Sequence, residues 1–369
     1  MTGKAIKRDI FDRYCHEVGS LSKSASNAVE RSIEGWYELR IQQQDPPTVA
    51  ECREYAKQAM AGYVQVYDEA ASSLAARWYD ERAKESELHL EQAVTTNIWN
   101  PKSDDEVARY QAKKLAKLDK GGIGPFARAC GEYAANDVMR SLNETIIKNV
   151  GRDADKGAKF ARVPTGYETC TFCMMLASRG AVYHTRKSAG EFRHFHRGCD
   201  CKVVPAFGND KYEEVVQGVR PKELLGQWEC FKEIDKDESL TWKQRREIKM
   251  DILSGGSGEL YTSESATEWG HAKLNKHAVE HAERLGVENP KSREGQIEYD
   301  SIMSDIIDKH DAMIITHCLS GQDGNRCAVF VRGHDIAVIN LDTRMRVTAF
   351  RYGPGVSRVY DAIWDQIGT

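Results

Sequence analysis

Two closely spaced pairs of cysteines constrain this chain more than any other feature. Cys170 and Cys173 form a Cys-x-x-Cys pair, and Cys199 and Cys201 form a Cys-x-Cys pair after 25 intervening residues. A Cys-x-x-Cys turn directs two thiolates toward one ion, and a second soft cluster completes a tetrahedral shell; thiolate mixed with imidazole favours zinc. The sequence therefore predicts a structural zinc held by Cys170 and Cys173 with two of His196, Cys199 and Cys201.

A disulfide pair and four unrelated core thiols are the alternatives to this metal site. Six further cysteines are scattered singly: Cys15, Cys52, Cys130, Cys230, Cys318 and Cys327. This is no disulfide framework, and close Cys/His clusters in an intracellular chain are typical of metal sites. Residues 1–8 lack the apolar core of a signal peptide, and no run approaches the roughly 18 apolar residues that span a bilayer. We expect a soluble protein, made in a reducing cytoplasm, with no membrane partner.

The first part of the chain, to about residue 150, has helical periodicity. Its clearest helix runs from Cys52 to about Lys84, between the helix breakers Pro46-Pro47 and Pro101. Apolar residues recur there at three- and four-residue spacing: Tyr55, Ala59, Gly62, Tyr63, Val66, Ala70, Leu74 and Trp78. We interpret this stripe as core packing. A further helix is predicted from Phe126 to about Val150.

Between Pro164 and Phe207, around the cysteines, the long helical spacing of apolar residues gives way to short segments. Residues 1–207 are therefore predicted to form a mainly α domain that ends in a small zinc-stabilised α+β segment. Residues 208–265 are strongly charged and predict a helical linker with one helix, Leu240–Leu253. Thr241 begins that helix as a capping box.

The last hundred or so residues, 266–369, predict an α+β domain with helices packed on an antiparallel sheet. One helix is expected at His271–Leu285, and a second carries an apolar stripe of Tyr299, Ile302, Met303, Ile306 and Ile307. After this helix, apolar residues recur at every second position, which is typical of strands. The predicted strands are Met313–His317, Cys327–Arg332, Asp335–Asn340 and Arg346–Tyr352.

The cysteine motif resembles a known family. Its members share Cys-x-x-Cys, then a Gly, then His-x-x-Cys-x-Cys near the end of the domain. The matching residues here are Cys170, Cys173, Gly180, His196, Cys199 and Cys201. The segment that holds them resembles the minor head proteins of tailed phages in the Mu F-like, or head-morphogenesis, group. The resemblance covers about residues 5–207, and its specific part is the last 45 residues of that range. Arg197 stands where that family usually has Pro. The resemblance implies a minor capsid component beside the portal, with portal and capsid proteins as partners and the virion as its location.

A second resemblance concerns the C-terminal domain. His277 and His281 lie four apart on a predicted helix, and so on one face. Their segment resembles the start of colicin D-type ribonuclease toxins, although Glu280 stands where that family has a catalytic Lys. Thr348 and Phe350 match the Ser/Thr-x-aromatic element of the superfamily that groups barnase, EndoU, colicin and RelE folds. The resemblance implies a metal-independent endoribonuclease that acts on RNA, tRNA included, in the host cytoplasm and has an immunity protein as partner.

Metal-free RNA cleavage requires a base, an acid and a donor for the charge on the phosphorane. Histidine titrates near working pH and can serve as base or acid. We assign His281 as general acid or base and His277 as a second proton carrier or a contact to the phosphate. Thr348 is assigned as the hydroxyl that contacts the phosphate, and Arg351 as the cation that replaces the missing Lys.

The distribution of charge in the C-terminal domain leaves an alternative to the ribonuclease interpretation open. Residues 266–369 hold 12 Lys and Arg against 15 Asp and Glu, which counts against RNA binding, whereas residues 324–360 hold six Arg against two Asp. The paired histidines are equally explained as a solvated helix face. The alternative is a purely structural head protein whose C-terminal domain is an inactive binding module. ADP-ribosyl transfer, a third activity fused to this head family, lacks its Arg, Ser-Thr-Ser and Glu-x-Glu set here.

Overall fold

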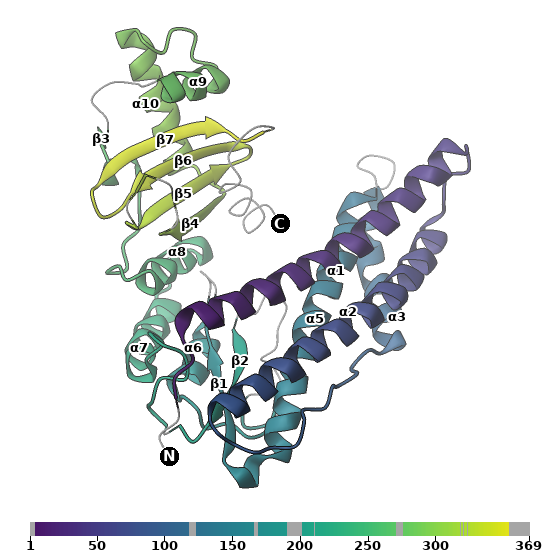
Figure 1. Ribbon diagram of the computed structural model, residues 1–369. Coiled ribbons are helices and arrows are strands. Elements are labelled where there is room, and N and C mark those ends of the chain that lie inside the picture. Colours follow the sequence, from purple (N-terminus) through teal and green to yellow (C-terminus); the bar gives the residue numbers. More distant parts are fainter. Residues whose placement is uncertain are drawn as a thin grey trace. The chain divides into compact units, whose positions relative to one another are not determined.

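The structure is a computed structural model that divides into two compact units, Met1–Trp228 and Glu229–Thr369. It describes residues 4–117, 123–165, 169–189, 201–209, 211–270, 276–317, 319, 321–322 and 324–353. Within these ranges it describes every side chain except those of residues 116, 117 and 277. The first unit is mainly helical, and the second combines helices with a sheet (Figure 1).

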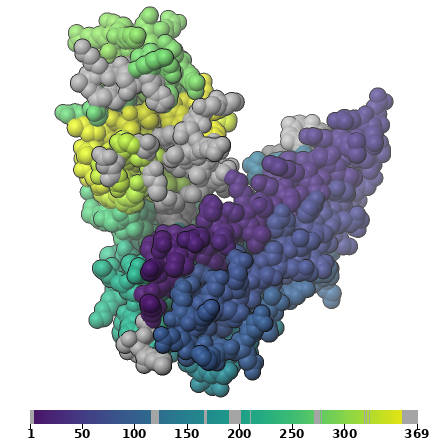
Figure 2. Space-filling model, viewed as in Figure 1, coloured from purple at the N-terminus to yellow at the C-terminus, as the bar shows by residue number. Residues whose placement is uncertain are grey.

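Three long helices build the first unit: α1 (Arg8–Gln42), α2 (Val49–Glu85) and α5 (Gly124–Arg152). They pack lengthwise against one another, with α3 (Pro101–Gln111) beside α2 and α5 (Figure 1). The helix predicted from Cys52 is confirmed and begins earlier, because Thr48 and Glu51 form a capping box. The helices α1 and α2 (purple to blue) account for much of the visible surface of this unit (Figure 2).

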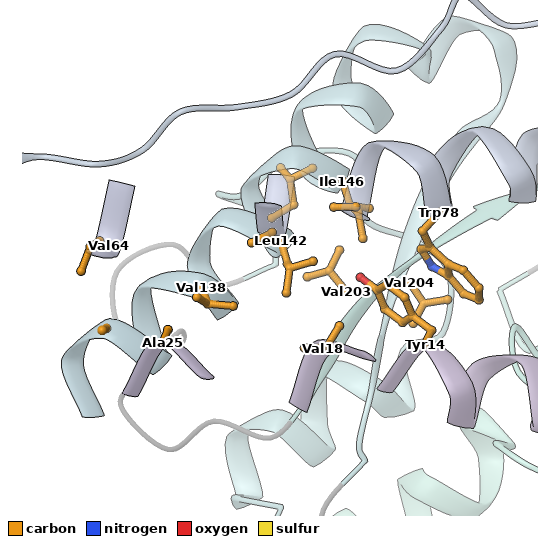
Figure 3. Close-up of a cluster of buried hydrophobic side chains, with 14 of the residues drawn as sticks. Tyr14, Val18, Ala25, Val64, Trp78, Val138, Leu142, Ile146, Val203 and Val204 are labelled. Atoms are coloured by element: carbon orange, nitrogen blue, oxygen red, sulfur yellow. The ribbon is translucent and has the colours of Figure 1, made fainter. Parts of the chain in front are cut away.

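The core of the first unit follows from the spacing of apolar residues on these helices. The buried side of α1 repeats every three to four residues: Phe11, Tyr14, Val18, Ala25, Val29 and Ile33. Tyr14 stacks on Trp78 of α2 with ring centroids 4.4 Å apart, and both lie beside Val203 and Val204 (Figure 3). Aromatic pairs of this kind add about 0.5–1.5 kcal/mol beyond area burial. The stripe containing Trp78 is therefore core, as predicted.

A small α+β segment completes the first unit. Strands β1 (Ala158–Val163) and β2 (Lys202–Phe207) pair antiparallel, with Arg162 opposite Val203. The short helix α6 (Thr171–Ser178) lies between them in sequence and packs on β1. The predicted α+β character of this segment is confirmed, while its stabilisation by zinc remains a prediction.

The second unit has a five-stranded sheet in the order β3-β7-β6-β5-β4. Its strands are β3 (Glu268–Trp269), β4 (Ala312–Thr316), β5 (Cys327–Arg332), β6 (Asp335–Asn340) and β7 (Met345–Arg351). The four strands β4 to β7 form the predicted antiparallel meander. The two-residue strand β3 pairs parallel to β7 and is not predicted.

The helices of the second unit pack their apolar stripes on this sheet. Helix α10 (Arg293–Asp308) buries Tyr299, Met303, Ile306 and Ile307, as its stripe predicts. Helix α9 (Lys276–Leu285) contacts β7; residues 271–275 of the predicted helix lie outside the described residues.

The segment predicted to hold one helix contains two. Helix α8 (Trp242–Leu253) begins at the predicted Thr241–Gln244 capping box, but α7 (Pro221–Lys236) precedes it. The single-helix prediction was wrong because the many charged residues of α7 obscure its apolar side, which buries Phe231. Helix α8 packs on β4 and contributes Met250 to the core, so the second unit includes much of the predicted linker.

Candidate functional site

The first candidate site lies where α6 begins between β1 and β2. Cys170 caps α6, and its sulfur accepts a hydrogen bond from the Cys173 amide at 3.3 Å. The cap turns the Cys-x-x-Cys segment so that Cys173 is fully buried. Cys201, directly before β2, places its Sγ 3.2 Å from the Cys173 Sγ. The structure thus joins one predicted ligand from each cysteine pair.

A buried arginine contacts these sulfurs. Arg162 of β1 is 1 % exposed. Its Nε lies 3.2 Å from Cys201 Sγ, its Nη2 also contacts that sulfur, and Nη2 lies 3.7 Å from Cys173 Sγ. The sequence analysis did not find Arg162; its place two residues before Pro164, at the edge of an apolar strand, was the available signal.

The donor chemistry fits a soft metal ion, although the described residues do not complete its ligand set. Two sulfurs bound to one tetrahedral zinc at about 2.3 Å each lie about 3.8 Å apart. The Cys173 and Cys201 sulfurs lie 3.2 Å apart, so a small separation would seat the ion between them. No group of three metal-ligating side chains is placed to hold an ion within the described part of the chain. The other predicted ligands, His196 and Cys199, lie outside the described residues.

The local backbone explains why Gly180, the glycine of the family motif, is a glycine. It adopts φ +69°, and a Cβ there would lie 1.9 Å from the backbone oxygen of Lys211. Only glycine fits this backbone conformation and close approach. Nearby, Tyr183 donates a hydrogen bond to the Leu176 oxygen at 2.8 Å, and burial raises the pKa of Tyr183 to about 12. Both residues fix the chain that follows α6.

The second candidate site lies between α9 and β7. His281 of α9 is 9 % exposed, and its Nδ1 lies 2.9 Å from the Thr348 Oγ1 on β7. The His281 ring also packs against Phe350, with centroids 5.0 Å apart at 39°. Thr348 and Phe350 share a face because side chains alternate along a strand. The structure therefore brings together three residues that the sequence analysis selected from two distant segments.

Tyr299 supports this arrangement from α10. Its hydroxyl donates to the Ala349 oxygen at 2.7 Å and accepts from the Ala349 amide at 2.9 Å. Burial raises the pKa of Tyr299, against the lowering effect of its hydrogen bonds with Ala349 and Thr348. The apolar stripe of α10 predicted that Tyr299 lies in the core. It did not predict these hydrogen bonds, because a position in the stripe does not reveal where the hydroxyl points.

The other predicted catalytic residues are placed differently. His277 belongs to α9, one turn before His281, but its side chain lies outside what the structure describes. Arg351 follows Phe350 and so faces away from Thr348. Its guanidinium pairs with Asp335, Nε to Oδ1 at 2.7 Å, and this hydrogen bond raises the pKa of Arg351. The structure does not bring Arg351 to His281.

Two further arginines of the hairpins also have partners within the protein. Arg346 is 6 % exposed and donates to the Ala266 oxygen at 2.8 Å and to Ser304 Oγ at 2.9 Å. Arg344 pairs with Glu259 at 2.6 Å. The arginine-rich hairpins therefore hold the second unit together through these contacts, in addition to any role toward phosphate.

Comparison with known proteins identifies the family. The model of the family described as VG15 protein matches residues 6–230, more than half of the chain. The chain is 37 % identical to the Gene 15 protein of Mycobacterium phage D29 over 13 % of this chain and 28 % of that protein. It is 33 % identical to the Gene 15 protein of Mycobacterium phage L5 over 13 % of this chain and 29 % of that protein.

These matches define a class of phage proteins, and the chain belongs to the VG15 protein family. The match to the two curated relatives covers under a third of the length of either one. No solved structure matches. The family match ends at residue 230 and so leaves nearly all of the second unit outside it. Among the described residues, no helix is long and apolar enough to cross a membrane.

Proposed function

We propose that this chain is a virion-associated minor head protein that carries a ribonuclease-like effector in its second unit. The head assignment is supported by the VG15 family match over nearly the whole first unit and by the phage origin of the relatives. The cysteine motif adds the likeness to Mu F-like head proteins. We place the protein beside the portal, with portal and capsid proteins as partners.

Mass spectrometry of purified virions and procapsids tests the head assignment. The chain should be present in few copies relative to the major capsid protein and should co-purify with the portal protein. A lysate protein of the same phage that is made during assembly but is not packaged serves as the control. Virions and procapsids that both lack the chain would refute the assignment.

A structural zinc in the first unit is part of the proposal. Cys170, Cys173 and Cys201 supply thiolates, with the further sequence candidates His196 and Cys199. When bound, zinc would cross-link α6 to the start of β2, and its binding energy would become folding energy. Elemental analysis of the full chain should give about one zinc per chain. Cys173→Ser should lose it, whereas Cys230→Ser, at an exposed cysteine in the second unit, should keep it.

The contact between His281 Nδ1 and Thr348 Oγ1 carries the ribonuclease proposal. It joins an imidazole, a side chain that can serve as acid or base, to a hydroxyl at the position where the related toxins place theirs. His281 would act as general acid or base on RNA, and Thr348 would donate its hydroxyl to the scissile phosphate. His277 remains the proposed second proton carrier.

The position of Arg351 decides which charge it can offset on the RNA. Arg351 would have to leave Asp335 and reach the opposite face of β7 to offset the charge on the phosphorane. We therefore propose Arg351 as a contact to a flanking phosphate. The His281→Ala and Arg351→Ala variants separate the two roles: His281→Ala should lower the chemical step by roughly 10²- to 10⁴-fold. Arg351→Ala should mainly raise the RNA concentration needed for half-maximal rate.

One observation favours a second candidate function, an inactive module that binds another head component. Arg344, Arg346 and Arg351 all have protein partners in the structure. Glu280, exposed on α9, adds negative charge where the related toxins have Lys. Full-length protein that leaves RNA intact but still enters virions would favour this second candidate.

A further inference from the structure

The first unit has a surface groove that neither candidate site uses. It lies between α3 and α5, both labelled in Figure 1, and has a volume of about 680 Å³. Val107 and Tyr110 of α3 and Tyr133 of α5 line it and give it apolar contact surface. Tyr110 is 66 % exposed. A groove of this size with tyrosines in its lining is typical of a surface that binds a partner.

Arginines give the groove a positive charge. Arg109 of α3 and Arg140 of α5 line it, and Glu106 alone is acidic among the described residues of the lining. Lys113, which follows α3, adds a positive charge, because its Nζ lies 3.9 Å from the centre of the Tyr110 ring. Arg109 is exposed and, within the part of the chain that the structure describes, has no acidic partner. Three cations against one carboxylate favour an anionic ligand.

Two buried carboxylates hold lining side chains in place. Asp137, which is 2 % exposed, accepts a hydrogen bond from Arg140 Nη1 at 2.8 Å. Asp104, which is fully buried, accepts one from the Tyr133 hydroxyl. The Arg140 side chain is still 41 % exposed, so the guanidinium is fixed without being removed from solvent. Side chains that are fixed before binding lose less conformational entropy when a partner arrives, and the groove is preorganised in this sense.

We propose that this groove docks an acidic segment of a neighbouring head protein. The inference rests on the proposed head function and names the surface through which the chain makes contact. Carboxylates of the partner would pair with Arg109 and Arg140, and an apolar residue of the same segment would pack on the Tyr110 ring. Arginine and tyrosine are among the residues that most often dominate the binding energy of an interface. A nucleic acid fits less well, because its continuous phosphate backbone would meet Glu106, whereas a peptide carries carboxylates at a few positions.

Photo-cross-linking in procapsids tests this docking surface. The full chain carries benzoylphenylalanine in place of Tyr110 or, as a control, in place of Tyr212, and mass spectrometry identifies the peptide that becomes attached. Tyr212 is the matched control, because it also belongs to the first unit, is 50 % exposed and has Lys211 Nζ 5.0 Å from its ring centre. We expect position 110 to attach a portal or capsid peptide with more Asp and Glu than Lys and Arg, and position 212 to attach none.

A reversal of charge tests the role of the arginines. Arg109→Glu should lower incorporation of the chain into procapsids by roughly tenfold or more, because like charges that face each other across an interface repel. Arg31→Glu, at an exposed arginine of α1 outside the groove, should be incorporated like wild type. The proposal would be overturned by normal incorporation of Arg109→Glu, by no product at position 110, or by a product with DNA, a second copy of the chain or a peptide without net negative charge. Wild-type chain absent from procapsids would instead refute the head assignment, and this proposal with it.

Discussion

Asp137 gives the sharpest test of how the first unit balances buried charge. The residue lies in α5 and is 2 % exposed. Its Oδ1 accepts a hydrogen bond from Arg140 at 2.8 Å, and its Oδ2 has no partner among the described residues. Burial raises the pKa of Asp137 to about 6; Arg140 opposes this shift, and Asp68 and Asp104 add to it.

The raised pKa sets the direction of the pH dependence. An unfolded aspartate has a pKa near 3.8, so the folded chain binds this proton more tightly. Between about pH 4 and about pH 6 the folded state holds more protons than the unfolded state, and the free energy of unfolding therefore falls as pH rises. A shift of about two pKa units at about 1.4 kcal/mol each amounts to about 3 kcal/mol. That stability is complete below the unfolded pKa and is lost as pH rises through about 6.

Asp137→Asn should remove this dependence, because asparagine has the same shape, can still accept from Arg140 and does not ionise. Urea denaturation of the full chain, followed by tryptophan fluorescence, should show the variant about 2–3 kcal/mol more stable than wild type near pH 8 and nearly equal near pH 4. Asp45→Asn is the control, since the Asp45 side chain is 68 % exposed. A variant with the wild-type pH slope, or one less stable than wild type near pH 8, would refute the reasoning.

Three further predictions concern stability. Tyr299→Phe removes the hydroxyl that contacts both backbone groups of Ala349, and should lower the free energy of unfolding of the second unit by about 1–3 kcal/mol, measured by urea denaturation. His310→Ala should cost about 3–5 kcal/mol in the same assay, because it removes the imidazole whose Nε2 lies 2.8 Å from Oε1 of the buried Glu247; an unchanged midpoint would contradict this account of the pair. Gly180→Ala should lower the melting temperature of the first unit, whereas Gly157→Ala, at φ +88° with open space, should cost only backbone strain of about 1 kcal/mol.

Much of the fold follows from periodicity in the sequence. The predicted helix from Cys52 to about Lys84 has nearly the bounds of α2, and the predicted apolar stripe lies within α10. The predicted bounds of β5 and β6 are the observed ones, and both faces of these strands are buried. Helix α7 was missed since its charged residues outnumber its buried ones. Strand β3 was not predicted, because a strand of two residues is too short to show an alternation of apolar and polar side chains. It is defined only by its backbone pairing with Met345 and Arg346.

The candidate sites were predictable in part. The spacing of His281, Thr348 and Phe350 was matched to a family element, and the fold places them together. The partners of the arginines were not predictable. Asp335 reaches Arg351 only after β6 pairs with β7, and Asp300 reaches Arg346 only after α10 packs on the sheet. The contacts of Arg162 were likewise not predicted: an arginine in a strand is usually solvated, and only the pairing of β2 with β1 brings this one to Cys173 and Cys201.

RNA cleavage by the full-length chain is the measurement that tests the central claim most directly. Purified wild type, His281→Ala and the control His334→Ala, at an exposed histidine of the second unit, are incubated with total RNA and with tRNA, with and without a chelator. The account predicts cleavage by wild type and His334→Ala that persists in chelator, and a loss of roughly 10²- to 10⁴-fold in His281→Ala. RNA left intact by folded wild-type protein, or cut equally fast by His281→Ala, would contradict it.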